Sequence, residues 1–139
     1  MTLGLLALTT PARGQLVGDN VPATTGTPIQ NEPQVAAFGN TLVAVWHLDT
    51  FYRSSGWGVS VDGGGTWTNG GAFPVADPFR DGTWGGSTVC VDQAGRFHAA
   101  TVYSRDWWGV ALYRGAAVGG SLSWEGPLFA IPPTLISGF

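Results

Sequence analysis

The sequence contains no lysine and a single cysteine, and charged residues make up only 11% of its 139 positions. Its six basic residues are all arginine, and nine acidic residues bring the net charge to −3. Without a basic surplus the chain cannot neutralise phosphates, which argues against nucleic-acid binding. The lone Cys90 excludes a disulfide scaffold. No apolar run reaches the roughly 20 residues that a membrane-spanning helix needs.

Glycine and aromatic residues are abundant. The chain has 22 glycines, 44% hydrophobic residues and 12% aromatic residues. This hydrophobic content is sufficient to build a core, so a disordered chain is not expected. Each glycine destabilises a helix by about 1 kcal/mol relative to alanine. We therefore expect no helix.

The first 14 residues resemble the end of an export signal. Leu3–Leu8 is a short apolar run, and Ala12 and Gly14 have the small-x-small spacing of a signal-peptidase site. Because the basic n-region is missing, two interpretations are open. We favour a truncated signal peptide over residues 1–14, which predicts a secreted or periplasmic protein; the alternative is the poorly ordered start of a cytosolic protein. Residues 15–31 are polar and predict an extended lead-in.

From Glu32 onward the sequence is typical of β structure. Short runs rich in Val, Trp, Tyr, Phe and Thr alternate with clusters of Gly, Asn and Asp, which is the signature of strands and tight turns. Strands are expected over residues 34–38, 41–47, 57–61, 66–68, 87–92, 96–103, 107–113 and 121–125. Tight turns are expected at residues 39–40, 62–65 and 93–95.

This strand pattern repeats after about 50 residues when Gly39 is aligned with Gly95. Four strands per unit at this period are typical of β-propeller blades. We therefore predict an all-β fold, a partial β-propeller of two four-stranded antiparallel blades. The blades are expected over residues 32–75 and 86–130.

The most specific motif has the form Ser-x-Asp-x-Gly-x-Thr-Trp, with Ser60, Asp62, Gly64, Thr66 and Trp67 at its fixed positions. The aspartate can accept hydrogen bonds from the backbone of its own turn. The glycine allows a backbone conformation that a side chain would hinder. The tryptophan ring is expected to pack between sheets. We interpret these residues as a structural turn, because a carboxylate saturated with donors is a poor acid or base.

This motif resembles the Asp-box, or BNR repeat, of sialidases and related secreted bacterial propellers. Asn31–Val35 and Leu42–Trp46 resemble the first two strands of a sialidase-like blade, and Thr88–His98 resembles the recurring strand–turn–strand of the family. The resemblance implies that residues 32–139 are a sialidase-like propeller fragment, with further blades outside this sequence. In the family the box is a structural staple on the propeller face away from the active site.

The second copy of the motif, Gly119–Trp124, departs from the family pattern. It keeps a hydroxyl residue before the tryptophan but has no aspartate at the matching position. We expect this turn to be held in another way.

No catalytic set is recognisable. Sialidases hold the substrate carboxylate with three arginines, whose planar forks match a carboxylate, and they use a tyrosine nucleophile, a glutamate and an aspartate. No segment here matches the arginine-bearing motif, so no catalytic residue is carried over. Arg53, Arg80 and Arg105 lie in expected loops, either solvated, which we favour, or facing a carbohydrate ligand.

The predicted function is part of a secreted sialidase-like glycoside hydrolase, inactive as this isolated fragment. The alternative is a non-catalytic Asp-box propeller module that binds protein or glycan. Two blades leave open sheet edges, so pairing with the remaining blades, or edge-to-edge self-association of a marginally folded chain, is also expected.

Weaker candidates concern metals and cofactors. The carboxylates of Asp77 and Asp81 in the segment 77–82 suggest calcium, but the regular oxygen ligands of a calcium loop are missing, and we favour a plain turn. His47 and His98 are expected to be ordinary strand residues, since no acidic or cysteine partner lies at metal-site spacing. We therefore expect no metal and no cofactor.

Two further predictions concern apolar side chains. Trp84, Trp107 and Trp108 offer surfaces for stacking on a sugar, although at least one of the adjacent pair is expected in the core. Cys90, in an apolar strand, is predicted to be an inert core thiol.

Overall fold

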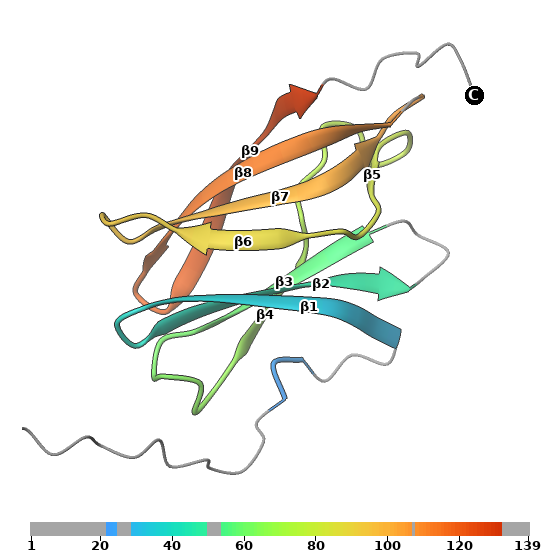
Figure 1. Cartoon of the computed structure of the whole chain (residues 1–139). Coiled ribbons are helices and arrows are strands. Elements are labelled where there is room, and N and C mark those ends of the chain that lie inside the picture. Colours follow the sequence, from blue (N-terminus) through green and yellow to red (C-terminus); the bar gives the residue numbers. More distant parts are fainter. Residues whose placement is uncertain (1–21, 25–28, 50–53, 107, 132–139) are drawn as a thin grey trace, which may run out of the picture.

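The computed structural model describes residues 22–24, 29–49, 54–106 and 108–131 (Figure 1). These residues form strands and connections, with no helix among them, and the strands build two antiparallel sheets that stack on each other. The prediction of an all-β fold is confirmed. Within the described ranges no helix is long and apolar enough to cross a membrane.

The first sheet is a four-stranded meander in which each strand pairs with the next. Its strands are β1 (Ile29–Phe38), β2 (Thr41–Asp49), β3 (Ser54–Ser60) and β4 (Thr68–Ala72). The short turn between β1 and β2 falls where glycine and asparagine were expected to provide it. Gly39 has φ +58°, a left-handed conformation that glycine adopts at little cost.

The second sheet has the same pattern with an interrupted first strand. Its strands are β5 (Gly82–Thr83), β6 (Thr88–Val91), β7 (Arg96–Ser104), β8 (Trp108–Val118) and β9 (Ser121–Ile131). Both β5 and β6 pair with β7, at opposite ends of it. The very short β5 was not predicted, because two residues, one of them a glycine, carry no strand periodicity.

Strand β1 begins earlier than predicted, inside the expected lead-in. A β-bulge between Asn31 and Gln34 lets the strand continue pairing with the far end of β2. Glu32 within this bulge has φ +53°, and its carboxylate accepts a hydrogen bond of 2.8 Å from the backbone N–H of Gly86. The bulge therefore directs a charged side chain of the first sheet onto the segment that leads into the second.

The two sheets share one hydrophobic core between their facing surfaces. Trp57 of β3 meets Trp124 of β9 edge to face at 5.9 Å, and Phe73 lies 5.2 Å from Trp124. The fully buried core residues include Val43, Val45, Val59, Phe97, Ala99, Tyr103, Ala111 and Tyr113. The core tryptophan of the first unit is thus Trp57, whereas Trp67 of the Asp-box is half-buried and lies outside this cluster.

Cys90 is not a core thiol, contrary to the prediction. Side chains alternate between the two faces of a strand, and in β6 it is Val89 that points into the core. Cys90 is consequently exposed on the outer face of the second sheet.

The two ends of the stacked sheets differ in their connections. The turn end carries the short turns after β1, β3, β6 and β8. The loop end carries the long connection from β4 to β6, which contains β5, and the segment between β7 and β8.

Candidate functional site

At the turn end, the Asp-box side chains form a closed set of hydrogen bonds. The Asp62 carboxylate accepts from the Thr66 backbone N–H at 2.8 Å, from the Thr66 hydroxyl at 2.7 Å and from the Ser60 hydroxyl at 2.8 Å. Ser60 Oγ in turn accepts from the Gly64 N–H at 2.8 Å. Gly64 has φ +96°, so a residue with a side chain would be strained there.

These contacts set the chemistry of Asp62. The Thr66 hydroxyl, followed by the Thr66 backbone N–H and the Ser60 hydroxyl, lowers the pKa of Asp62 from 3.8 to about 2. Each donor stabilises the ionised form. A carboxylate with this pKa holds its turn together but does not exchange protons near neutral pH.

A second aspartate turn lies in the second sheet, within the segment that the sequence predicts as strand–turn–strand. Asp92 accepts from the backbone N–H groups of Ala94 and Arg96 at 2.9 Å each, and its other carboxylate oxygen lies 3.1 Å from His98 Nε2. The Arg96 N–H first, and then His98, lower the pKa of Asp92. In both turns the aspartate accepts from the N–H four residues later. That spacing, followed by a strand, is the signal that a search for the full motif missed.

The degenerate motif at Gly119 and Gly120 is held by backbone conformation. Both glycines have positive φ, +59° and +86°, which suits a two-residue hairpin turn. The Ser121 hydroxyl adds a hydrogen bond of 3.2 Å to the carbonyl oxygen of Val118. No aspartate is needed there.

The loop end gathers the charged and aromatic residues that were considered for ligand binding. Arg105 donates to both carboxylate oxygens of Asp81, at 2.6 and 2.8 Å, and the Tyr103 hydroxyl donates to the same carboxylate at 2.6 Å. The Asp81 side chain is completely buried. Arg105 first, with Tyr103 as a further donor, holds the pKa of Asp81 far below its usual range. Burial and the bond to Asp81 raise the pKa of Tyr103.

Arg80 also binds a carboxylate of its own chain. One of its terminal nitrogens contacts both oxygens of Asp106, at 2.7 and 2.8 Å, on the exposed surface. Arg80 and Arg105 therefore each hold an aspartate of the same chain, although both side chains keep a partly exposed surface. Arg53, the third predicted loop arginine, lies outside the described residues.

Two tryptophans meet at the same end. The rings of Trp84 and Trp108 lie 5.0 Å apart, edge to face, and the Trp84 indole N–H donates to the Ser104 hydroxyl at 2.6 Å. Trp108 is 50% exposed, which leaves an aromatic surface open to solvent. Trp107, the other member of the predicted pair, lies outside the described residues.

The segment around Asp77 and Asp81 is a turn in which the two aspartate side chains accept hydrogen bonds from the backbone of the segment. The Asp77 carboxylate accepts from the Phe79 N–H at 3.0 Å, while the Asp77 N–H donates to the Asp81 carboxylate at 2.8 Å. His47 is half-buried against Gly85, far along the chain from His98. In the part of the chain that the structure describes, no three His, Cys, Asp or Glu side chains converge as a metal site would require.

Comparisons with known proteins leave these features to be judged on their geometry. Neither the family models nor the curated proteins that were compared with the chain match it.

Proposed function

We propose that the chain forms two adjacent blades of a sialidase-like β-propeller, exported from the cell, whose ring binds a carbohydrate at the loop end. The observation that carries this proposal is the pair of successive antiparallel meanders, one of four strands and one whose first strand is divided into β5 and β6, stacked with the turns after β1, β3, β6 and β8 at one end. Blades of a propeller have this form. An Asp-box turn closes the first meander, and the related turn of Asp92 joins β6 to β7.

The loop end is the better candidate for the ligand. The motif at residues 60–67 resembles the Asp-box of sialidases, and in that family the boxes lie away from the active site. Here both aspartate turns lie at the opposite end from Trp84 and Trp108. An exposed aromatic ring offers the flat apolar surface on which a sugar ring packs. A half-exposed Trp108 beside a well-fixed Trp84 meets that requirement.

Hydrolysis needs more than this chain supplies. Arg80 and Arg105 hold Asp106 and Asp81, so the substrate carboxylate would have to be gripped by residues of neighbouring blades. The same pairing favours a second candidate function, a non-catalytic module that binds glycan or protein. An arginine triad and a Tyr/Glu pair in neighbouring blades would support the hydrolase function. Their absence from a complete ring would support the non-catalytic binding module.

Titration with an oligosaccharide that ends in sialic acid, followed by tryptophan fluorescence, tests the proposal. We expect saturable binding that Trp108→Ala weakens at least tenfold. Phe38→Ala serves as the matched control, because Phe38 is a similarly exposed ring at 48% but lies at the turn end. Equal binding by both variants would refute the loop-end site. Turnover of a fluorogenic sialoside by the chain itself would refute the prediction that it is inactive alone.

A further inference from the structure

The contact between the two sheets is of the head-to-tail kind. β1 lies against β6, and Trp57 and Phe73 of the first unit meet Trp124 of β9, so both sheets run in the same order (Figure 1). Their turn ends also coincide, since a side chain at Gly95 would collide with Phe38. A two-fold axis parallel to the strands would reverse the order of one sheet. The sheets are therefore related by a displacement, and such a contact leaves one equivalent face open on each sheet.

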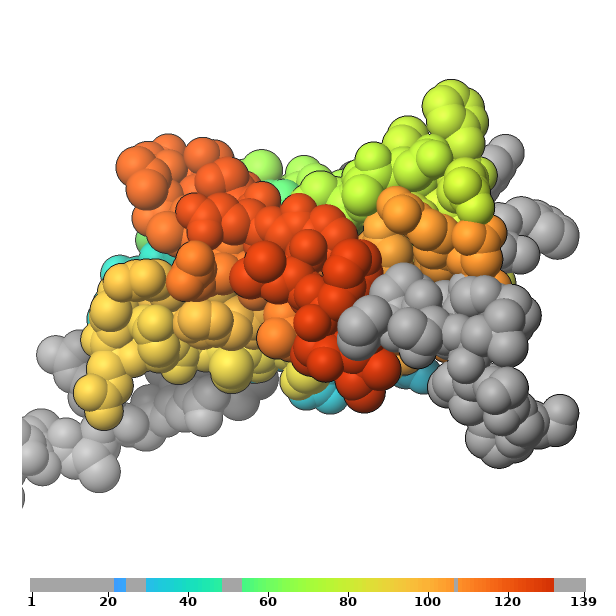
Figure 2. Space-filling model, turned by 90° about the horizontal axis from the view of Figure 1, so that it is seen from above, coloured from blue at the N-terminus to red at the C-terminus, as the bar shows by residue number. Residues whose placement is uncertain are grey.

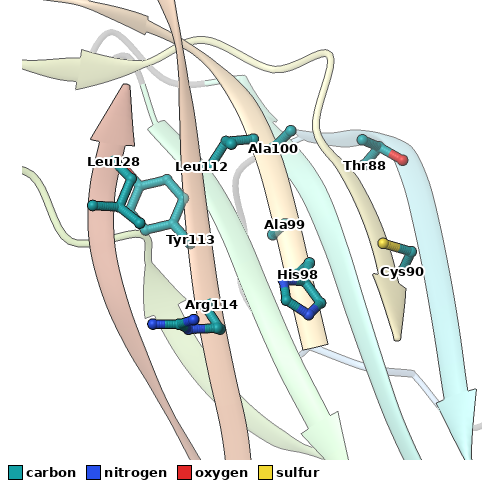
Figure 3. Close-up of a pocket in the computed structure, with 9 residues that line it drawn as sticks. All are labelled: Thr88, Cys90, His98, Ala99, Ala100, Leu112, Tyr113, Arg114 and Leu128. Atoms are coloured by element: carbon teal, nitrogen blue, oxygen red, sulfur yellow. The ribbon is translucent and has the colours of Figure 1, made fainter. Parts of the chain in front are cut away.

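The open face of the second sheet is apolar and hollowed. Figure 2 looks onto this face, which is built from β6 to β9. The face holds a hollow of about 230 Å³, and Figure 3 labels the side chains that line it. Leu112 and Leu128, partners on β8 and β9, are 41% and 58% exposed. Cys90 borders the same hollow from β6. Exposed apolar surface of this kind marks an interaction site.

The charged groups beside the hollow are paired with one another. His98 contacts Asp92 at 3.1 Å, and Arg114 contacts Glu125 at 3.2 Å. In Figure 3, His98 lies between Arg114 and Cys90 on neighbouring strands. A sheet that docks here therefore leaves none of these residues as an isolated buried charge, which would be the costlier case.

The complementary face lies on the outer side of the first sheet. Val35 of β1 is 59% exposed and pairs with Ala44, on the face opposite the core residues Val43 and Val45. Further across this face the Trp46 ring lies on Gly56. The carbonyl oxygen of Ala23 would be 3.2 Å from a Cβ at Gly58, so residues 22–24 approach the β3 side. Ala44 and Trp46 of β2 are already buried on this face, so its exposed part is the β1 side, and β1 is the strand that meets β6 within the chain.

We propose that the outer face of the second sheet docks the outer β1 face of the first sheet of a second copy, so that copies stack head to tail. The inference rests on the blade-type stacking of the proposed function and deepens its second candidate, the non-catalytic module, because further copies add no catalytic set. Each copy carries both halves of a contact of the kind seen between its own sheets. Such a contact produces a ring if the rotation between successive copies adds up to a full turn, and an open filament if it does not.

Two surface variants test this arrangement by light scattering after size-exclusion chromatography. Leu112→Glu blocks the face of the second sheet, and Val35→Glu blocks the face of the first. We expect the unaltered chain to form oligomers and each variant alone to be monomeric with unchanged circular dichroism. An equimolar mixture of the two variants is expected to form a dimer, because one intact contact remains. Phe79→Glu, at a 96% exposed position in the connection between β4 and β5, is the control and should oligomerise normally.

Cys90 provides a second readout, because it is the only cysteine and lies on the face that would be covered. Its reaction with a maleimide is expected to slow at least tenfold in the oligomer and to return to the free rate in Leu112→Glu. A monomeric unaltered chain with freely reacting Cys90 would overturn the inference. So would oligomers that persist in Val35→Glu, since they would indicate a face-to-face pair. A monomer that still binds sugar through Trp108 would refute the stacking of copies and leave the proposed function standing.

Discussion

At the scale of single residues, aspartates stabilise two tight turns and the loop end. Asp62 and Asp92 hold tight turns and Asp81 anchors the loop end, and the hydrogen-bond donors around each lower its pKa. A chain with so few charges places these three carboxylates where backbone or side-chain donors would otherwise lack partners. Their value lies in accepting hydrogen bonds while ionised, which ties the stability of the fold to pH.

The first prediction concerns Asp62. Because its pKa is lowered from 3.8 to about 2 in the folded chain, its ionised form stabilises the fold above about pH 4, and this contribution is lost as the pH falls from about 4 toward 2. Asp62→Asn should therefore be less stable than the unaltered chain at pH 7, with the difference shrinking below pH 4. Urea denaturation at several pH values measures this. Asp106→Asn, which removes only an exposed ion pair, should have little effect. A difference that does not vary with pH would contradict the prediction.

At the scale of elements, the two sheets are joined by polar contacts as well as by the core. Ser55 of β3 and Thr101 of β7 share a hydrogen bond of 3.0 Å, and the Ser87 hydroxyl donates to the same Thr101 oxygen at 3.0 Å. Thr101 donates in turn to the carbonyl oxygen of Gly85 at 3.2 Å. All three hydroxyl residues are buried, and their partners are one another and the Gly85 backbone, whose N–H donates to Ser55 Oγ at 3.0 Å.

The second prediction follows from this buried hydroxyl cluster. Thr101→Val keeps the shape of the side chain but leaves Ser55, Ser87 and the Gly85 carbonyl with fewer partners. Leaving a buried polar group unsatisfied costs about 1–3 kcal/mol, and we expect a loss of unfolding free energy in this range. Urea denaturation measures it, with Thr88→Val on the exposed face of β6 as the matched control. Equal stability of the two variants would show that the cluster adds nothing.

At the scale of the whole molecule, neither sheet has a core of its own. Apart from Ala44 and Trp46 on the opposite face of β2, the buried apolar residues of the two sheets form one cluster, so the first sheet buries its core face against the second. The sheets should therefore fold and unfold together, as small proteins with a single core do.

The third prediction tests whether the two sheets unfold together. Phe97 of β7 is 1% exposed, and truncating a buried phenylalanine costs about 3–5 kcal/mol. Phe97→Ala should therefore destabilise both sheets, although the change lies in the second. Hydrogen exchange read by mass spectrometry should show amides of β2 and β3 losing protection together with those of β7 and β8. Val118→Ala should leave protection unchanged. Loss confined to β6–β9 would mean that the sheets unfold separately.

Much of this organisation was readable in the sequence because it is local. Alternating apolar residues and turn glycines predicted most strands within a few residues of their observed ends, and the Asp-box spacing identified a turn whose contacts span four residues. Such features depend on neighbours along the chain. They were sufficient for an all-β fold of antiparallel sheets.

Other features were decided only by the tertiary structure. The sequence placed Cys90 in the core and Trp67 between sheets, whereas the stacking selected Val89 and Trp57. An apolar strand does not reveal which of its two faces will be covered, because shifting the register by one residue exchanges the faces. The pairing of Arg105 with Asp81, 24 residues away, likewise exists only because β7 and the long connection meet at one end. The sequence by itself thus determined strands and turns, and the packing of one sheet on the other determined which side chains are buried, paired or open.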